Sequence, residues 1–286
     1  MIYAEMNAAY PALIDKALEE GELFEPRGYK CLELRPYSFT MADPTKTIYQ
    51  GVSRKLNARF FAIETLSYIA GLGSEPWHAD LMVMANQGMA AFRNEDSGLF
   101  DGAYGPRIKK SIGDVIELLK RDKDSRQAVC SIWSPGIPKS KDVPCTVCLH
   151  FFRKKGKLEM HVYMRSNDLN WGLPYDVPAF AAIQLHVADR LGWEAGSYHH
   201  TAGSLHVYLN ERDEKGQPGP PRLDLENERY EVRRVPVVGD PSWIEPALRH
   251  AWEIQKEHDC WTDFAGMGVP EPWRSMIANK TWYESA

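Results

Sequence analysis

Apolar and polar residues recur at helical spacing in several parts of the chain. Residues 5–22 alternate apolar and charged positions and predict a surface helix. Residues 54–71 are more apolar and end in glycine, which predicts a buried helix. Residues 111–122 form a short amphipathic helix pattern. Residues 178–192 have proline in the first turn and glycine just past the end, which also predicts a helix.

Strand patterns fill the region between the third and fourth of these helices. They cover residues 127–133, 145–153 and 157–164, and Lys154-Lys155-Gly156 predicts the turn that joins the last two as a hairpin. Residues 197–208 return to strand character. Because helices are mixed with hairpin-connected strands instead of regular strand–helix–strand units, the pattern predicts an α+β layered domain.

Composition narrows the class of protein. Apolar residues make up 44% of the 286 residues and charged residues 26%, as in soluble globular proteins. The formal net charge of −5 argues against broad electrostatic binding to nucleic acid, so no direct contact with DNA or RNA is expected. No window approaches the roughly 18 consecutive apolar residues of a membrane span, so no membrane association is expected.

The cysteines and the N-terminus indicate a cytoplasmic protein. Five cysteines are too few and too scattered for a disulfide framework. The N-terminal segment is acidic and amphipathic, unlike a secretion signal. A cytoplasmic, reduced protein is therefore expected, and a reduced compartment keeps a nucleophilic thiol usable.

Cys145 is the first candidate for chemistry. It follows Pro144 at the start of a predicted strand, and a nucleophilic thiol at such a strand end needs cationic groups or dipoles nearby. Taken alone, Cys145 is more often interpreted as a buried small residue. No metal is expected, because a spacing of three turns Cys145 and Cys148 to opposite faces of a strand and no second cysteine pair exists.

A polar segment follows the predicted hairpin. Arg165 and Ser166 can hold a phosphate together, the guanidinium by a forked charge contact and the serine by its hydroxyl. Asp168 and Asp176 flank a glycine-containing turn and can point into one site. The alternative is a solvated loop whose aspartates cap turns.

His206 and Tyr208 end the last predicted strand. They are two residues apart, so their side chains share one face. Such a pair suits the hydroxyl groups of a sugar. The alternative is a pair of core polar residues whose hydrogen bonds are satisfied within the protein.

These segments, in this order and spacing, resemble the thymidylate synthase superfamily. The resemblance covers about residues 27–213 and is strongest over 124–208. It implies a single catalytic domain over 1–286 in which a large, mixed or mostly antiparallel sheet is packed with helices. Residues 214–286 would be a C-terminal extension of unknown role, and QPGPP at 217–221 predicts a loop there.

The resemblance implies a role for each motif residue. Cys145 matches the catalytic cysteine, Glu64 the catalytic glutamate and Tyr104 the active-site tyrosine, and Asp168 is also expected in catalysis. A carboxylate in an apolar helix is costly unless used or paired, which agrees with a functional Glu64. The residues expected to bind the nucleotide are Arg27, Arg126, Arg165, Ser166, Asn167, Asp176, His206 and Tyr208.

The resemblance also implies a partner and a co-substrate. Each subunit of the family's dimer donates its Asp124-Ser125-Arg126 segment to the partner's site, so a homodimer with a donated Arg126 is expected. The expected co-substrate is 5,10-methylenetetrahydrofolate. The residues expected to contact it are Trp77, Asp168, Trp171 and Gly172, and core packing explains the two tryptophans equally well.

Departures from the synthase pattern indicate the base. Synthases carry an asparagine where this chain has Asp176, and the amide matches uracil. A carboxyl group that shares one proton accepts from the amino group of cytosine and also bonds N3. At this position the chain therefore resembles the deoxycytidylate hydroxymethylases. Thr146 and Ser204 also depart from the synthase pattern in the direction of those enzymes. Gln127 replaces the second arginine of the phosphate segment, which leaves the identity of the sugar phosphate open.

The expected reaction is hydroxymethylation of dCMP at C5. Cys145 adds to C6 of the pyrimidine, the folate provides the carbon for C5, and Glu64 orients the water that completes the product. Three alternatives stay open: a CMP hydroxymethylase of nucleoside-antibiotic biosynthesis, a thymidylate synthase acting on dUMP, and a non-catalytic nucleotide-binding protein. The presence of Cys145, Glu64 and Tyr104 together argues against the last, since binding alone needs none of them.

Overall fold

The structure is a computed structural model that describes residues 1–51, 54, 56–136, 140–209, 230, 233–261, 264 and 266–279. Within these residues the chain forms two β-sheets and seven α-helices. The helices are α1 (Met6–Glu20), α2 (Ala58–Ala70), α3 (Pro76–Ala85), α4 (Gly105–Arg121), α5 (Leu173–Leu191), α6 (Ile244–His258) and α7 (Trp273–Asn279). The strands are β1 (Ile2–Tyr3), β2 (Glu22–Phe24), β3 (Cys31–Leu34), β4 (Tyr37–Met41), β5 (Val129–Ser131), β6 (Thr146–Lys154), β7 (Lys157–Met164), β8 (Asn167–Asp168), β9 (Ala195–Ala202) and β10 (Leu205–Tyr208).

The larger sheet is mixed. Its six strands have the order β1-β4-β9-β7-β6-β5. β6 and β7 pair antiparallel, and β9 joins β7 in parallel after the chain has crossed over through α5. The smaller sheet has the order β2-β3-β10-β8. Mixed sheets packed with helices confirm the α+β class predicted from the sequence.

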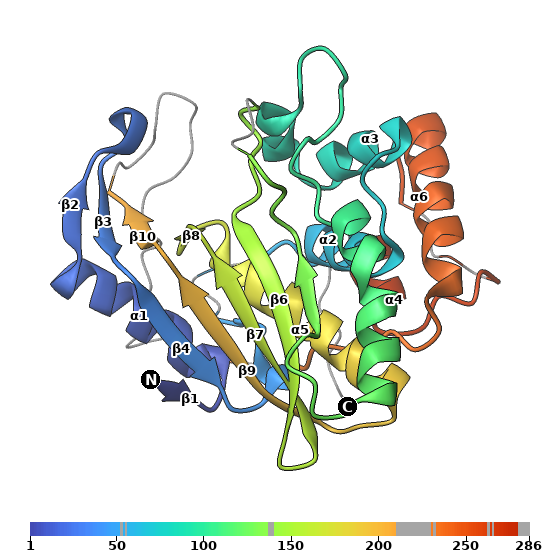
Figure 1. Cartoon of the computed structure of the whole chain (residues 1–286). Coiled ribbons are helices and arrows are strands. Elements are labelled where there is room, and N and C mark those ends of the chain that lie inside the picture. Colours follow the sequence, from blue (N-terminus) through green and yellow to red (C-terminus); the bar gives the residue numbers. More distant parts are fainter. Residues whose placement is uncertain are drawn as a thin grey trace.

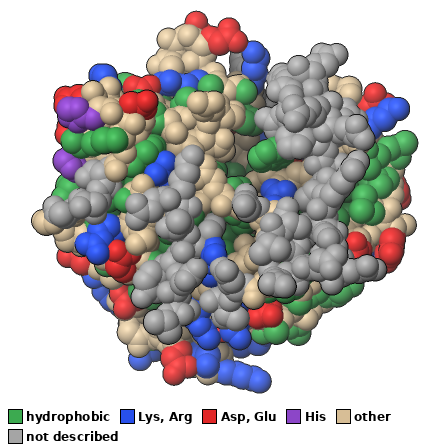
Figure 2. Space-filling view, turned by 180° about the vertical axis from the view of Figure 1, so that it is seen from behind, with side chains coloured by type: hydrophobic (Ala, Val, Ile, Leu, Met, Phe, Trp, Pro, Cys, Tyr) green, Lys and Arg blue, Asp and Glu red, His purple; other side chains and the backbone are tan. Residues whose placement is uncertain are grey.

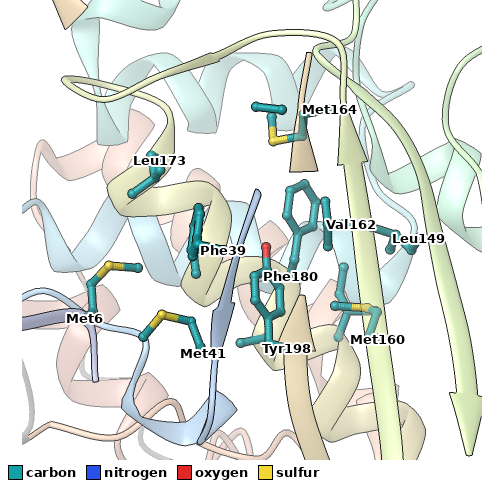
Figure 3. Close-up of a cluster of buried hydrophobic side chains, with 14 of the residues drawn as sticks. Met6, Phe39, Met41, Leu149, Met160, Val162, Met164, Leu173, Phe180 and Tyr198 are labelled. Atoms are coloured by element: carbon teal, nitrogen blue, oxygen red, sulfur yellow. The ribbon is translucent and has the colours of Figure 1, made fainter. Parts of the chain in front are cut away.

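One face of the larger sheet packs against α5 (Figure 3). Met160 and Val162 of β7 point to this core and are fully buried, while His161 between them lies on the other face. Phe180 of α5 lies among these side chains and is also fully buried. Burial of apolar surface contributes roughly 25 cal/mol per Å², so this layer is a stable base for the residues at the ends of β6, β7 and α5.

A second apolar cluster joins α2 and α3 to the C-terminal helices. Phe61 of α2 stacks on Trp273 of α7, with ring centroids 6.1 Å apart. Arg59 of α2 donates hydrogen bonds to the carbonyl oxygens of Ile277 and Ala278. The extension after residue 214, to which the sequence assigned no element, therefore contains two helices that support α2.

Three predicted elements differ from the observed ones. The helix predicted at 111–122 is longer than expected, because α4 already begins at Gly105. Residues 197–208, predicted as one strand, form β9 in the larger sheet and β10 in the smaller sheet, because the chain bends at Gly203 and Ser204. Pro178 lies inside α5, not in its first turn, because that helix already begins at Leu173.

Other predictions hold more closely. β6 and β7 meet at Lys155 and Gly156, whose φ angles of 51° and 82° are typical of a tight hairpin turn. The predicted helix at 54–71 is observed as α2, which is capped by Gly71 in the left-handed conformation. The loop predicted at 217–221 lies outside the described residues.

The other face of the larger sheet is polar and aromatic, and Figure 1 looks onto it with α5 behind. His150, His161 and His199 stand side by side across β6, β7 and β9. Val129 and Tyr163 on the same face are exposed by 41% and 36%. We refer to this side as the outer face of the sheet.

Charged side chains of both signs are scattered over the molecule. Seen from behind, Lys and Arg are interspersed with Asp and Glu and do not gather into a large patch of one sign (Figure 2). A helix with the length and apolar character needed to cross a bilayer does not occur within the described ranges.

Candidate active site

Tyr104 is positioned by the close packing of α2 and α4. It directly precedes α4, and a Cβ on the next residue, Gly105, would lie 2.1 Å from the carbonyl oxygen of Leu72, so only glycine fits. The Tyr104 hydroxyl accepts hydrogen bonds from the backbone N–H groups of Cys145 at 3.1 Å and Thr146 at 3.2 Å. The predicted tyrosine and the predicted nucleophile are therefore in contact.

Cys145 lies just before β6 and beside a guanidinium group. The Nε of Arg165 donates to the carbonyl oxygen of Pro144 at 2.9 Å, and its Nη2 is 3.6 Å from the Cys145 Sγ. Burial raises the pKa of the Cys145 thiol to about 11; Arg165 opposes this shift and Asp176 adds to it. The resting thiol is therefore protonated at neutral pH, and Arg165 is placed to stabilise the thiolate when it forms.

Cys145 and Cys148 do not form a common site. A register shift between Thr146 and Cys148 interrupts the pairing of β6 with β7, and Cys148 pairs with Ser131 of β5 in the sheet. Both thiols are free. In the described part of the chain, no group of three or more His, Cys, Asp or Glu side chains is arranged to hold a metal ion.

Asp176 lies in the first turn of α5 and is held by Asn167. The Nδ2 of Asn167 donates to the Oδ2 of Asp176 at 2.7 Å. Gly172 leaves room for this pair, since a Cβ there would lie 2.9 Å from that carboxylate oxygen. Burial raises the pKa of Asp176 to about 7, and the hydrogen bond from Asn167 opposes the rise. Near neutral pH this carboxyl group therefore both donates and accepts hydrogen bonds.

Glu64 projects from the middle of α2 and is half-buried. Burial raises its pKa to about 8; Asp176 adds to the rise, and a hydrogen bond with Tyr68 opposes it. The two carboxyl groups therefore interact with each other, and Asp176 also interacts with the Cys145 thiol. Coupled carboxyl groups with raised pKa values are typical of functional sites.

Asp168 caps the turn before α5. It accepts hydrogen bonds from the backbone N–H groups of Asn170 at 2.6 Å and Trp171 at 3.3 Å. Burial raises the pKa of Asp168, and His206 opposes this shift. Asp168 thus caps a turn, as expected if it only stabilises the loop. It also interacts with His206 of β10, as expected if it belongs to the site.

The end of β10 collects three of the predicted nucleotide ligands. His206 is buried, with its Nδ1 3.2 Å from the Ser204 hydroxyl, and its ring centroid is 5.0 Å from that of Tyr208. Arg27, in the loop before β3, is exposed and hydrogen-bonds the side chain of Tyr208. The structure therefore brings Arg27, His206 and Tyr208 together from distant parts of the sequence.

Arg126 lies apart from the other predicted residues. Ser166 is half-buried next to Arg165, whereas Arg126 is exposed before β5. In the β5–β6 register Val129 lies opposite His150, which places Arg126 near the far end of β6. At about 3.3 Å per residue, that end is roughly 26 Å from Cys145. Arg126 does not join the other ligands within one chain.

The two predicted folate-stacking tryptophans have different surroundings. Trp77 is buried between α3 and α6, with its ring 6.4 Å from that of Trp252 and 4.6 Å from the Arg249 guanidinium. Core packing therefore accounts for Trp77. Trp171 is 42% exposed beside Asp168, so core packing does not account for it in the same way.

Sequence reasoning missed Tyr68 as a residue of the site. It hydrogen-bonds Glu64, and its ring stacks on Tyr104 with centroids 5.3 Å apart. The spacing of four residues from Glu64 on one helix was the available signal. An aromatic residue in an apolar helix is first interpreted as core, so this signal was not used.

Comparison with known proteins identifies the family. A family model described as thymidylate synthase matches residues 62–230, which include Glu64, Tyr104, Cys145 and Asp176. The chain is 32% identical over 279 residues to a deoxyuridylate hydroxymethyltransferase of Bacillus phage SP01, and the alignment covers 90% of this chain and 71% of that relative. The chain therefore belongs to the thymidylate synthase family, whose members are one-carbon transferases that act on pyrimidine nucleotides.

Proposed function

We propose that this enzyme hydroxymethylates dCMP at C5. The single observation that carries the choice of base is the carboxyl group of Asp176, fixed by Asn167 beside the Cys145 thiol. In its protonated form this group donates to N3 of cytosine through one oxygen and accepts from the 4-amino group through the other. Uracil has a donor at N3 and an acceptor at C4, so the same group pairs with it less well.

The remaining nucleotide contacts follow from the positions of the side chains. Arg165 and Ser166 are adjacent in the loop after β7, and Arg27 lies near the end of β10, so these three residues bind the phosphate. His206 and Tyr208 share one face of β10 and bind the sugar hydroxyl. Asn167 has a buried side-chain oxygen that lacks a hydrogen-bond partner, which a donor on the nucleotide would satisfy.

The folate co-substrate fits beside the nucleotide. An exposed indole at Trp171 next to the carboxyl group of Asp168 offers a stacking surface and a hydrogen-bond acceptor to a flat, amino-bearing heterocycle such as a pterin. When bound, 5,10-methylenetetrahydrofolate supplies a one-carbon unit that is more oxidised than a methyl group. Gly172 follows Trp171 and keeps the chain close to Asp176.

Cys145 activates the base. Its sulfur adds to C6 of the pyrimidine while Arg165, 3.6 Å from the Sγ, stabilises the thiolate. This addition makes C5 nucleophilic, so C5 takes up the one-carbon unit. Tyr104, whose hydroxyl lies at the Cys145 backbone, assists removal of the C5 proton through ordered water. Loss of this proton together with departure of tetrahydrofolate as the leaving group gives an exocyclic methylene group on the base, and Glu64 then orients the water that adds to it.

We propose that the enzyme acts as a homodimer through the outer face of the larger sheet. Exposed Val129 and Tyr163 provide apolar contact area on that face. Arg126 is too far from Cys145 of its own chain to bind the same phosphate, and donation to a partner's site accounts for its position. A cytoplasmic location is proposed with this function, on the basis of the five free cysteines.

Hydroxymethylation of dUMP is the second candidate. The phage relative is a deoxyuridylate hydroxymethyltransferase, which favours uracil as the base. CMP is a third substrate to test, because Gln127 departs from the usual phosphate segment.

The test is product analysis with 5,10-methylenetetrahydrofolate and dCMP, CMP or dUMP. The proposal expects 5-hydroxymethyl-dCMP, no product from Cys145→Ala, and a shift of preference toward dUMP in Asp176→Asn. A 5-hydroxymethyl product mainly from dUMP would overturn the assignment of the base but keep the reaction. Methylated dUMP together with dihydrofolate would overturn the reaction itself.

A further inference from the structure

Tyr68 and Glu64 form a pair on one face of α2. They are four residues apart, so their side chains leave the helix on the same side. Both are half-buried, whereas Ile63 and Leu66 between and beside them are fully buried in the second apolar cluster. The Tyr68 hydroxyl and the Glu64 carboxyl group are hydrogen-bonded to each other.

The ring of Tyr68 is held by two other aromatic rings. It stacks on Tyr104 with centroids 5.3 Å apart and on Phe180 with centroids 6.2 Å apart. Tyr104 is in turn fixed by the backbone N–H group of Cys145. Because the ring is stacked and cannot swing away, its hydroxyl meets Glu64 from a defined direction.

We propose that Tyr68 is a positioning residue for Glu64. Its hydroxyl holds one carboxylate oxygen and leaves the other oxygen to orient the water that completes hydroxymethylation. The terminal torsion of a glutamate is otherwise broad, so a fixed donor is needed to aim it. The inference rests on the proposed function, because only an enzyme that adds water needs Glu64 aimed in this way.

The charges around the pair favour a neutral donor at this position. Burial and the carboxyl groups of Glu64 and Asp176 raise the pKa of Tyr68 well above its ordinary value, with Tyr104 adding to the rise. Tyr68 therefore remains a proton donor throughout the working pH range. Its bond to the charged form of Glu64 favours ionisation of that carboxyl group against the effects of burial and Asp176.

The step that depends on this arrangement is the addition of water. The water oxygen bonds to the exocyclic methylene carbon, and its proton passes to Glu64. The electron pair of the exocyclic double bond moves to C5 and then forms the C5–C6 double bond. The C6–S bond breaks in the same collapse and returns the thiolate to Cys145.

The test is the ratio of hydroxymethyl product to tritium released from C5-tritiated dCMP, measured against pH. This ratio reports only the events after C5 has lost its proton. Its pH dependence is therefore independent of the ionisation of Cys145. In Tyr68→Phe we expect the ratio to fall about 10- to 100-fold, as when one fixed donor is lost. We also expect its midpoint to move to higher pH, since Glu64 loses the bond that favours its ionisation.

Three further measurements keep the test sharp. Tyr3→Phe is the matched control, because it removes a hydroxyl at β1 on the edge of the sheet and should leave both quantities unchanged. Fluorotyrosine at position 68 is a stronger donor of the same shape and should move the midpoint to lower pH, even if Tyr68→Phe does not fold. Equilibrium binding of dCMP to Tyr68→Phe should change by less than about twofold.

The outcomes separate the two proposals. If tritium release and product formation fall together in Tyr68→Phe with an unmoved midpoint, Tyr68 is merely structural and the inference is wrong. If the wild-type enzyme forms no hydroxymethylated product from dCMP, CMP or dUMP, the proposed function itself fails.

Discussion

The carboxyl groups of Glu64 and Asp176 are half-buried and interact with each other, and burial raises both pKa values, to about 8 and about 7. Both residues were named from the sequence, because its resemblance to the thymidylate synthase family points to these two positions. The hydrogen bond between Asn167 and Asp176 was not predictable. It depends on how the chain turns at Gly172, which a one-dimensional pattern does not contain.

The pKa of Asp176 gives a pH dependence for substrate binding. If protonated Asp176 donates to N3 of cytosine, dCMP binding to Cys145→Ala weakens as pH rises above about 7. The loss approaches roughly tenfold per pH unit at higher pH, because one proton must be taken up on binding. Isothermal titration calorimetry between pH 6 and 9 measures this dependence directly.

Two variants serve as controls for this binding experiment. Asp176→Asn with dUMP should lack the dependence, since an amide does not titrate in this range. Asn167→Ala should move the onset to higher pH, because the lost hydrogen bond favoured ionisation of Asp176. Equal pH dependence in Cys145→Ala with and without the Asp176→Asn change would show that another group is responsible.

The same carboxyl groups destabilise the fold as pH rises. An acid whose pKa is raised by folding keeps its proton in the native state after the unfolded chain has lost it. Stability therefore falls between the unfolded pKa near 4 and the folded values of about 7 for Asp176 and about 8 for Glu64. Glu64→Gln and Asp176→Asn should each stabilise more at pH 8 than at pH 5, by on the order of 1 to 2 kcal/mol. Urea denaturation at the two pH values tests this, and a pH-independent effect would contradict it.

At the scale of elements, local signals decided what could be predicted. The β6–β7 hairpin was found because its turn residues have a local preference. β9 and β10 were merged, because nothing in alternation alone reveals that the chain changes sheets at Gly203, where a Cβ would lie 3.0 Å from the Arg165 carbonyl oxygen. Helix α6 was missed although its buried residues Ile244, Ala247, Leu248 and Ala251 recur at helical spacing, so that signal was available and was not used. Helix α7 has only seven residues, which is too short for such a pattern to be distinctive.

The turn into α5 makes a prediction about Gly172. A methyl group there would meet the Asp176 Oδ2 at 2.9 Å and the Asn167 Nδ2 at 3.0 Å, so Gly172→Ala pushes this pair apart. Because its backbone is in the right-handed helical region, with φ −81° and ψ −66°, alanine itself is not strained. We expect dCMP affinity to fall about tenfold or more, with a change in melting temperature of only a few degrees.

The matched control for Gly172→Ala is Gly113→Ala in α4. A Cβ at Gly113 meets no atom within 4 Å, so the change should stabilise by roughly 0.5 to 1 kcal/mol and leave activity unchanged. Unaltered dCMP binding by Gly172→Ala would mean that the Asn167–Asp176 pair does not read the base.

At the scale of the whole molecule, the outer face of the larger sheet and the position of Arg126 belong together. The face exposes Val129 and Tyr163. Arg126 lies near one end of the same sheet, and Cys145 lies near the opposite end. A two-fold arrangement of two such sheets brings the end that carries Arg126 toward the partner's Cys145. The proposed donation of Arg126 is therefore a property of the proposed dimer and not of the single chain.

Mixing two inactive variants tests this arrangement. Cys145→Ala has no nucleophile but can donate Arg126, whereas Arg126→Ala has a nucleophile but donates no arginine. When the two proteins are mixed and allowed to exchange subunits, half of the dimers are mixed and each mixed dimer has one complete site. Activity should therefore recover to about a quarter of the wild-type value on statistical grounds. If Arg126 instead served its own chain, both kinds of site in the mixed dimer would be defective and no recovery would occur.

A further change tests which surface forms the interface. Adding Tyr163→Glu to each variant places charge on the outer face. If that face forms the interface, activity should not recover on mixing, and sedimentation should show monomers.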